Sequence, residues 1–87
     1  MTREQVRVDF INVIQPFIRR DVMQELDDSM TLVEDLRVNS ARMVDIILDS
    51  EEKFKIAISD EEAGQLTTIG SAVDLIYLKT SREGSSV

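Results

Sequence analysis

The sequence contains no cysteine and no histidine, and these two absences restrict its chemistry severely. Without cysteine the chain has no thiol nucleophile and no disulfide framework, which suits a reducing compartment. Without histidine it lacks the usual imidazole base and the commonest metal ligand. Covalent chemistry on this chain therefore requires a group that is brought in from outside.

Long hydrophobic runs are also missing. No apolar segment approaches the roughly 18 residues of a membrane span, or the roughly 7–15 residues of a signal-peptide core. We therefore expect a cytoplasmic protein without a membrane span. At 87 residues, the chain is expected to form one domain with a thin core.

Basic residues are outnumbered by acidic ones. The 10 Lys and Arg residues against 17 Asp and Glu residues give a formal net charge of −7. This balance disfavours nucleic acid, whose phosphates would be repelled, and weakly favours basic protein surfaces as partners. Calcium-loop and phosphate-loop motifs are absent, and the adjacent Glu61 and Glu62 do not face each other on a helix. No metal site and no acid–base pair is predicted.

Apolar residues recur at spacings of three and four along three segments, which predicts three main helices. The first includes Phe10 and should kink or end near Ile14, because Pro16 lacks the N–H that a helix interior needs. The second runs over residues 40–54 and has charged residues on its opposite side. The third follows Thr67 and its neighbour Thr68, which are suited to cap it.

Capping motifs predict shorter elements between these helices. The segment Thr31–Glu34 fits a capping box that could open a single turn. Ser59–Glu62 is a second capping box and predicts a short helix that ends near Leu66. The predicted fold is an all-α, up-and-down four-helix bundle with a short third helix and a long loop between helices one and two. The helical domain is expected over residues 1–79, followed by a flexible polar tail over 80–87.

The start of the second predicted helix places a hydroxyl group where a polar loop becomes an amphipathic helix. Asn39 is a favourable N-cap residue, which puts Ser40 at the first helical position and in solvent. Unpaired N–H groups and the helix dipole make such a position suitable for a phosphate. A serine without a base is a poor nucleophile, but another enzyme can modify it. The pattern alone also fits a serine that only caps a helix.

The stretch from Leu32 to Ile76 resembles the acyl carrier protein family. Its first segment, Leu32–Leu36, resembles the one that leads to the family's attachment motif, and Asn39-Ser40 lies where that motif has Asp-Ser. Further segments match the family's second, third and fourth helices in order: Val44-Asp45, Glu51–Phe54, Ile58–Ala63, Thr67–Ile69 and Ala72–Ile76.

The resemblance implies that Ser40 receives a 4′-phosphopantetheine group from coenzyme A, which would supply the thiol that the chain lacks. The chain would not be an enzyme. It would hold an acyl group as a thioester and present it to partner enzymes of fatty-acid, polyketide or related specialised biosynthesis. The implied partners are a phosphopantetheinyl transferase and acyl-transferring or condensing enzymes with basic docking patches, and the carrier is expected to be a monomer. Candidate docking residues are Arg42, Asp45, Asp49 and Glu52, and Glu51 could also serve.

An acyl chain carried in this way is implied to slide into the core between the helices. The candidate residues for an acyl pocket are apolar and predicted to face inward: Val44, Ile47, Leu48, Ile58, Leu66, Ile69 and Val73. Taken singly, such residues also fit a plain hydrophobic core. The acidic residues of the second helix likewise also fit a solvated face.

Three positions depart from the family pattern, which usually has glycine at Arg37, aspartate at Asn39 and leucine at Ala41. Together with Arg42, they make the start of the second helix neutral to basic. Asn39 also removes a carboxylate that transferases commonly use. These departures indicate a specialised member of the family that serves a dedicated pathway. Two other functions remain open: an aminoacyl or peptidyl carrier, and an adaptor that keeps the carrier fold without the prosthetic group and binds an enzyme through its second helix.

Overall fold

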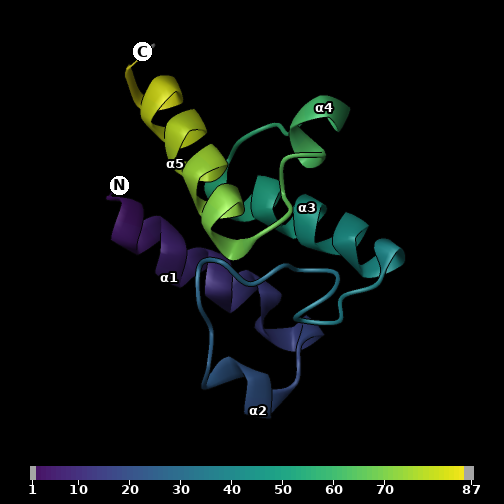
Figure 1. The fold of residues 1–87 in the computed structure, drawn as a ribbon. Coiled ribbons are helices and arrows are strands. Elements are labelled where there is room, and N and C mark those ends of the chain that lie inside the picture. The colour runs from purple at the N-terminus through teal and green to yellow at the C-terminus, as the bar shows by residue number, and fades with distance from the viewer. Residues whose placement is uncertain (1, 86–87) are drawn as a thin grey trace.

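The computed structural model describes residues 2–85, apart from the side chains of Met23 and of residues 82–85. Within these residues the chain is helical, and its one strand-like feature is an isolated bridge between Thr31 and Thr68. Figure 1 shows α2 at the bottom of the molecule, α4 and the C-terminal end of α5 at the top, and α1 and α3 between them. The elements, in chain order, are α1 (Arg3–Ile14), the 3₁₀ helix η1 (Gln15–Phe17), α2 (Arg20–Met23), α3 (Ser40–Phe54), α4 (Asp60–Ala63) and α5 (Ile69–Ser85). The predicted helical bundle is confirmed, while η1 and α2 were not predicted.

The ends of α1 follow from local sequence. The Thr2 hydroxyl oxygen accepts a hydrogen bond from the Gln5 N–H at 3.1 Å and so caps the first turn. The helix ends at Ile14, and Pro16 lies in η1 directly after it. Proline is tolerated in the first turn of a new helix but not in a helix interior, so the predicted stop near Ile14 is confirmed.

The predicted capping box at the start of α4 is present in full. The Ser59 hydroxyl accepts from the Glu62 N–H at 3.2 Å, and the Glu62 carboxylate accepts from the Ser59 N–H at 3.0 Å. The Lys79 ammonium lies 3.0 Å from the same carboxylate and ties α4 to α5. The hydrogen bond from the Ser59 N–H, and then the Lys79 ammonium, hold the pKa of Glu62 below its ordinary value. α4 ends at Ala63, earlier than the predicted end near Leu66.

The capping motif at Thr31 forms with a different partner from the predicted Glu34. The Thr31 hydroxyl accepts from the Asp35 N–H at 3.0 Å, and the Asp35 carboxylate accepts from the Thr31 N–H at 2.8 Å. These reciprocal bonds close the expected single turn, and α3 begins only after a further irregular stretch, at Ser40. The expected Thr31–Glu34 pairing is therefore wrong by one residue.

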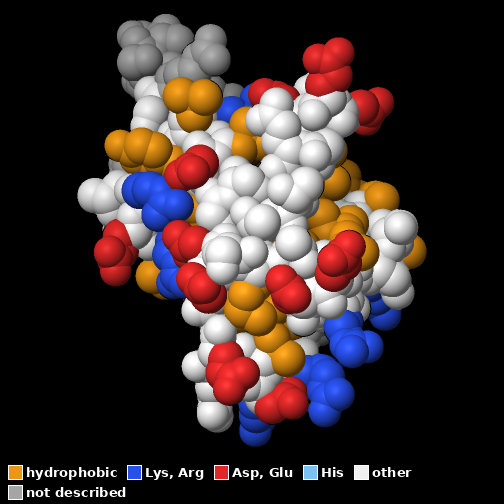
Figure 2. Space-filling view, in the orientation of Figure 1, with side chains coloured by type: hydrophobic (Ala, Val, Ile, Leu, Met, Phe, Trp, Pro, Cys, Tyr) orange, Lys and Arg blue, Asp and Glu red, His pale blue; other side chains and the backbone are white. Residues whose placement is uncertain are grey.

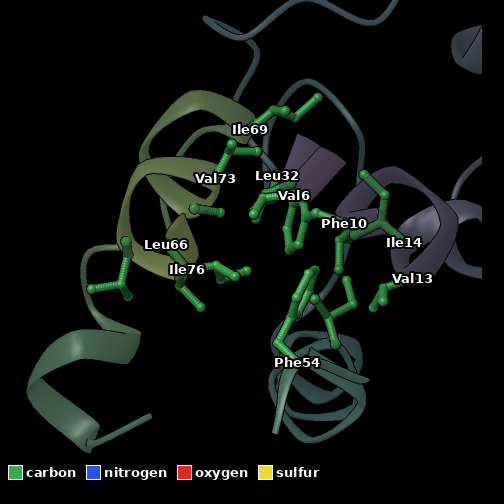
Figure 3. Close-up of a cluster of buried hydrophobic side chains, with 14 of the residues drawn as sticks. Val6, Phe10, Val13, Ile14, Leu32, Phe54, Leu66, Ile69, Val73 and Ile76 are labelled. Atoms are coloured by element: carbon green, nitrogen blue, oxygen red, sulfur yellow. The ribbon is translucent and has the colours of Figure 1, made fainter. Parts of the chain in front are cut away.

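The hydrophobic core lies where α1, α3 and α5 meet, and α1 packs against both other helices. Figure 3 shows Phe10 of α1, Phe54 of α3 and Ile76 of α5 pointing toward one another. The predicted stripe of α5 is confirmed, because Ile69, Ala72, Val73 and Ile76 are all fully buried. The loop before α3 adds three further buried side chains: Leu32, Leu36 and Val38.

Backbone hydrogen bonds hold the long loop against the first turn of α5. The N–H of Gly70 donates to the Asp28 carbonyl at 2.8 Å, and the N–H of Ile69 donates to the Met30 carbonyl at 3.1 Å. On the other side, the Leu32 N–H donates to the Thr67 carbonyl at 2.9 Å. A Cβ on Gly70 would lie 3.1 Å from the Asp28 carbonyl oxygen, so the absence of a side chain allows this close approach.

Asp28 also pairs with two arginines of α1. Its carboxylate lies 2.7 Å from Arg7 and 3.4 Å from Arg3, and Arg3 in turn lies 2.7 Å from Asp74 of α5. The hydrogen bond from Arg7, followed by that from Arg3, holds the pKa of Asp28 below its ordinary value, although partial burial opposes this. The loop is thus connected to α1 by ion pairs and to α5 by backbone hydrogen bonds.

The C-terminal segment differs from its predicted boundary. α5 continues to Ser85, so residues 80–85 extend the helix past the expected end of the helical domain at residue 79. Residues 86 and 87 lie outside the described residues. The flexibility of the 80–87 segment stays a prediction.

We expect Asp28→Asn to lower the free energy of unfolding at pH 7 by less than about 1 kcal/mol, because the carboxylate is partly exposed and its ion pairs are screened. The folded-state pKa of Asp28 is depressed, so its contribution is complete above the ordinary carboxyl pKa and is lost as the pH falls through the folded value. The two proteins should therefore converge in stability at low pH, as measured by denaturant unfolding across the acid range. A difference that persists unchanged at acid pH contradicts this account. Glu34→Gln removes an exposed carboxylate from the same loop and is the matched control at pH 7.

Candidate attachment site and docking face

Ser40 is the first residue of α3 and its side chain is exposed, as predicted. Asn39 has an extended conformation, and its side-chain oxygen accepts a hydrogen bond from the Arg42 N–H at 2.8 Å. This cap satisfies one of the N–H groups at the helix start, but the geometry of a helix leaves those of Ser40 and Ala41 without intrahelical acceptors. The hydroxyl of Ser40 therefore lies in solvent beside two N–H donors.

The loop before Ser40 is held against the core by two buried side chains, two positions apart. Leu36 and Val38 are buried, and the Val38 N–H donates to the Leu32 carbonyl at 3.0 Å. Arg37 lies between them and points outward in an exposed position. This arrangement fixes the path of the chain into α3 and so fixes where Ser40 is presented.

Arg37 adopts a left-handed conformation with a φ of 58°. Such a conformation costs an L-residue with a side chain roughly 1–2 kcal/mol, whereas glycine adopts it freely. The structure therefore explains why glycine would fit this position. The chain places an exposed cation there, three residues before Ser40.

The exposed face of α3 carries two apolar residues that were predicted to point inward. Val44 is 54% exposed and Leu48 is 55% exposed, so their assignment to the core is wrong. They lie four and eight residues after Ser40, which puts all three on one face of the helix. Apolar residues at 43, 44, 46, 47 and 48 cover too wide an arc for one face, so periodicity alone could not identify the side that packs. Figure 2 shows hydrophobic side chains at the surface in the region where Figure 1 places α3.

Exposed charged residues lie beside this apolar pair on α3. The four candidate docking residues are all exposed: Arg42, Asp45, Asp49 and Glu52. Arg42 and Asp45 lie 3.8 Å apart, a loose surface ion pair that contributes little to stability. Glu51 is engaged elsewhere, since its carboxylate accepts a hydrogen bond from the Ile58 N–H at 2.8 Å.

The remaining candidates for an acyl pocket lie on the inner side. Leu66, Ile69 and Val73 are buried, and Ile47 and Ile58 are half-buried against the same core. A surface hollow of about 580 Å³ lies between α1 and α3 but is lined by none of these residues. Its lining is Asn12, Val13, Pro16, Asp49, Glu52, Lys53 and Lys55.

Ser50 is a core residue that the sequence analysis missed. It is fully buried on α3, and its hydroxyl has no hydrogen-bond partner among the described residues. Its spacing of four residues from both Ile46 and Phe54, which are also buried, was the available signal. A serine in such a register is easily taken for a surface residue, because serine is more often exposed.

Known proteins resemble this chain along most of its length. An acyl carrier protein of an Exiguobacterium species is 34% identical over 79 residues, which cover 91% of this chain and 99% of the relative. The acyl carrier protein of Exiguobacterium sibiricum is 32% identical over 87% of this chain and 95% of its own length. The chain belongs to the acyl carrier protein family.

A solved structure agrees with this assignment. The acyl carrier protein from Enterococcus faecalis superposes with a TM-score of 0.76 at 31% identity, covering 91% of this chain and 99% of that one. No family model matches the chain. The role of this protein is therefore that of a carrier and not of an enzyme, as the resemblance implied.

Two further features of the described residues bear on the site. Over that part of the chain, no helix combines the length and the hydropathy needed to cross a membrane. No group of acidic side chains there is arranged to hold a metal ion.

We expect Arg37→Gly to raise the free energy of unfolding by about 0.5–1 kcal/mol, because relief of the left-handed strain outweighs the added freedom of glycine in the unfolded chain. Lys55→Gly is the matched control, since Lys55 has a φ of 57° at the other end of α3. Thermal melting should show a similar rise for both variants. Only Arg37→Gly should also speed modification by a broad-specificity transferase, because it removes a cation beside Ser40. Equal modification rates for the two variants would show that Arg37 has no part in recognition.

Proposed function

We propose that Ser40 carries a 4′-phosphopantetheine group whose thiol holds an acyl cargo for partner enzymes of fatty-acid, polyketide or related specialised biosynthesis. The observation that supports this most directly is an exposed serine hydroxyl at the first position of α3, in a chain of the acyl carrier protein family. We also keep a cytoplasmic, monomeric carrier as a prediction.

The residues at the start of α3 fit the proposed group. Its phosphodiester would lie at the positive end of the helix dipole, next to the open N–H groups of Ser40 and Ala41. Asn39 holds these groups in place through its cap on Arg42. When bound, the prosthetic group supplies the thiol that forms the thioester. The chain itself has no thiol, because it contains no cysteine. The base that deprotonates Ser40 would come from the transferase, because this chain has no histidine.

The outer face of α3 is the proposed docking surface for the transferase and for acyl-transferring or condensing enzymes. Val44 and Leu48 form an apolar centre on the same face as Ser40, and Asp45, Asp49 and Glu52 border it. Protein interfaces commonly combine an apolar centre with a polar rim. The acidic rim favours partners with basic patches and would act mainly on the rate of association.

The acyl pocket is proposed on the opposite, inner side of α3. Five of the seven residues predicted from the sequence are proposed to line it: Ile47, Ile58, Leu66, Ile69 and Val73. The other two, Val44 and Leu48, are exposed and belong to the proposed docking surface. Burial of each methylene of the cargo there would contribute roughly 0.8 kcal/mol to stability. One helix would then bear the attachment site, the docking surface and one wall of the pocket.

Incubation with coenzyme A and a broad-specificity transferase should add one phosphopantetheine unit to the intact mass, and peptide mapping should place it on Ser40. Ser40→Ala should abolish the gain, whereas Ser81→Ala, which removes an exposed serine from α5, should leave it unchanged. A gain on Ser50, Ser59 or Ser71 contradicts the site. No gain with several transferases supports the unmodified adaptor. A nitrogen-containing cargo on the natively loaded protein supports an aminoacyl or peptidyl carrier.

Asp45→Lys combined with Glu52→Lys should slow association with the transferase about tenfold at low salt and flatten its salt dependence, because exposed charges steer encounter. Asp60→Lys combined with Glu61→Lys makes the same change in net charge on α4 and is the matched control. Stopped-flow binding across a range of ionic strength measures both variants. An equal effect of the two pairs would mean that net charge, and not the face of α3, governs binding.

A further inference from the structure

The hydroxyl of Ser50 is a polar group enclosed in the core. The residue is 0% exposed, and its oxygen atom makes no hydrogen bond to any described group. A hydroxyl has one donor and two acceptor sites, and burying it without a partner is unfavourable. Alanine at this position would keep the helix and avoid that penalty.

Ser50 lies on the buried side of α3, the side on which Ile47 contributes to the proposed acyl pocket. Ile46 and Phe54 flank it on the buried face of α3, and the half-buried Ile47 lies three residues before it. Ten residues separate it from Ser40, a rise of about 15 Å along the helix axis. A chain that enters the core from the Ser40 end and follows the inner face of α3 therefore passes Ile47 before it reaches Ser50.

Catalysis does not account for this hydroxyl. The chain has no histidine or cysteine that could serve as its base, and Ser50 is closed to solvent. Its available chemistry is hydrogen bonding to a molecule that enters the core. An unbranched hydrocarbon chain offers no hydrogen-bonding atom, whereas a hydroxyl or oxo group offers an acceptor, and the hydroxyl also a donor.

We propose that Ser50 is a specificity-determining residue that hydrogen-bonds an oxygen atom on the acyl chain, so that this carrier sequesters hydroxy- or oxo-acyl cargo in preference to a saturated chain. This proposal rests on the proposed function, since it requires an acyl chain on Ser40. A pocket with a buried hydroxyl favours an oxygen-bearing acyl chain over a saturated one, because a saturated chain leaves the hydroxyl of Ser50 without a hydrogen-bond partner.

The test compares the melting temperatures of protein loaded from acyl-coenzyme A by a broad-specificity transferase. The cargoes are octanoyl, 3-hydroxyoctanoyl, 5-hydroxyoctanoyl and 7-hydroxyoctanoyl, and intact mass confirms loading before each melt. At least one hydroxylated chain should raise the melting temperature relative to octanoyl more in the wild type than in Ser50→Ala. The expected excess is roughly 4–8 °C, the shift that one net hydrogen bond gives a domain of this size.

Two further variants separate a hydrogen bond from a change in packing. Ser50→Thr keeps the hydroxyl and should keep the preference, whereas Ile46→Val trims the same face and should lower the shifts for all cargoes alike. If loading fails, the proposed function itself is wrong. If loading succeeds and every hydroxylated chain gives the same excess in the wild type and Ser50→Ala, only the assignment of Ser50 is overturned. If loading succeeds and no cargo shifts the melting temperature, the proposed acyl pocket is overturned together with the assignment of Ser50, while attachment at Ser40 stands.

Discussion

The seating of the long loop on the first turn of α5 is the constraint on which the rest of the structure depends. The first N–H groups of a helix have no partners within it, and here the carbonyls of Asp28 and Met30 accept from those of Gly70 and Ile69. One set of bonds thus completes a helix end and fixes a loop that has almost no helix of its own. Because that loop leads into α3, the same bonds decide where Ser40 lies.

The two long C-terminal helices therefore begin in opposite ways. The start of α5 is closed by the loop and by the Thr68 hydroxyl, which accepts from the Ser71 N–H at 3.0 Å. The start of α3 has a single side-chain cap from Asn39 and otherwise faces solvent beside Ser40. Such an open helix start suits a phosphate-bearing group, and the closed one serves only the fold.

The two faces of α3 have different surroundings. The inner face, with Ile46, Ser50 and Phe54, joins the core, and the outer face presents Val44 and Leu48 next to Ser40. The core of a small domain is thin, so the exposure of these two large apolar residues leaves out burial that would otherwise stabilise the fold.

Elements with a local cause could be predicted from the amino-acid sequence. Four features depend on residues within a few positions of one another: the end of α1 just before Pro16, the cap by Asn39, the box at Ser59 and the apolar stripe of α5. The side of α3 that packs could not be predicted from the sequence, because the apolar residues of this helix cover more than one face. That side depends on which residues contact α1 in the folded protein. The burial of Ser50 was decided in the same way, since a hydroxyl enters the core only when its distant neighbours enclose it.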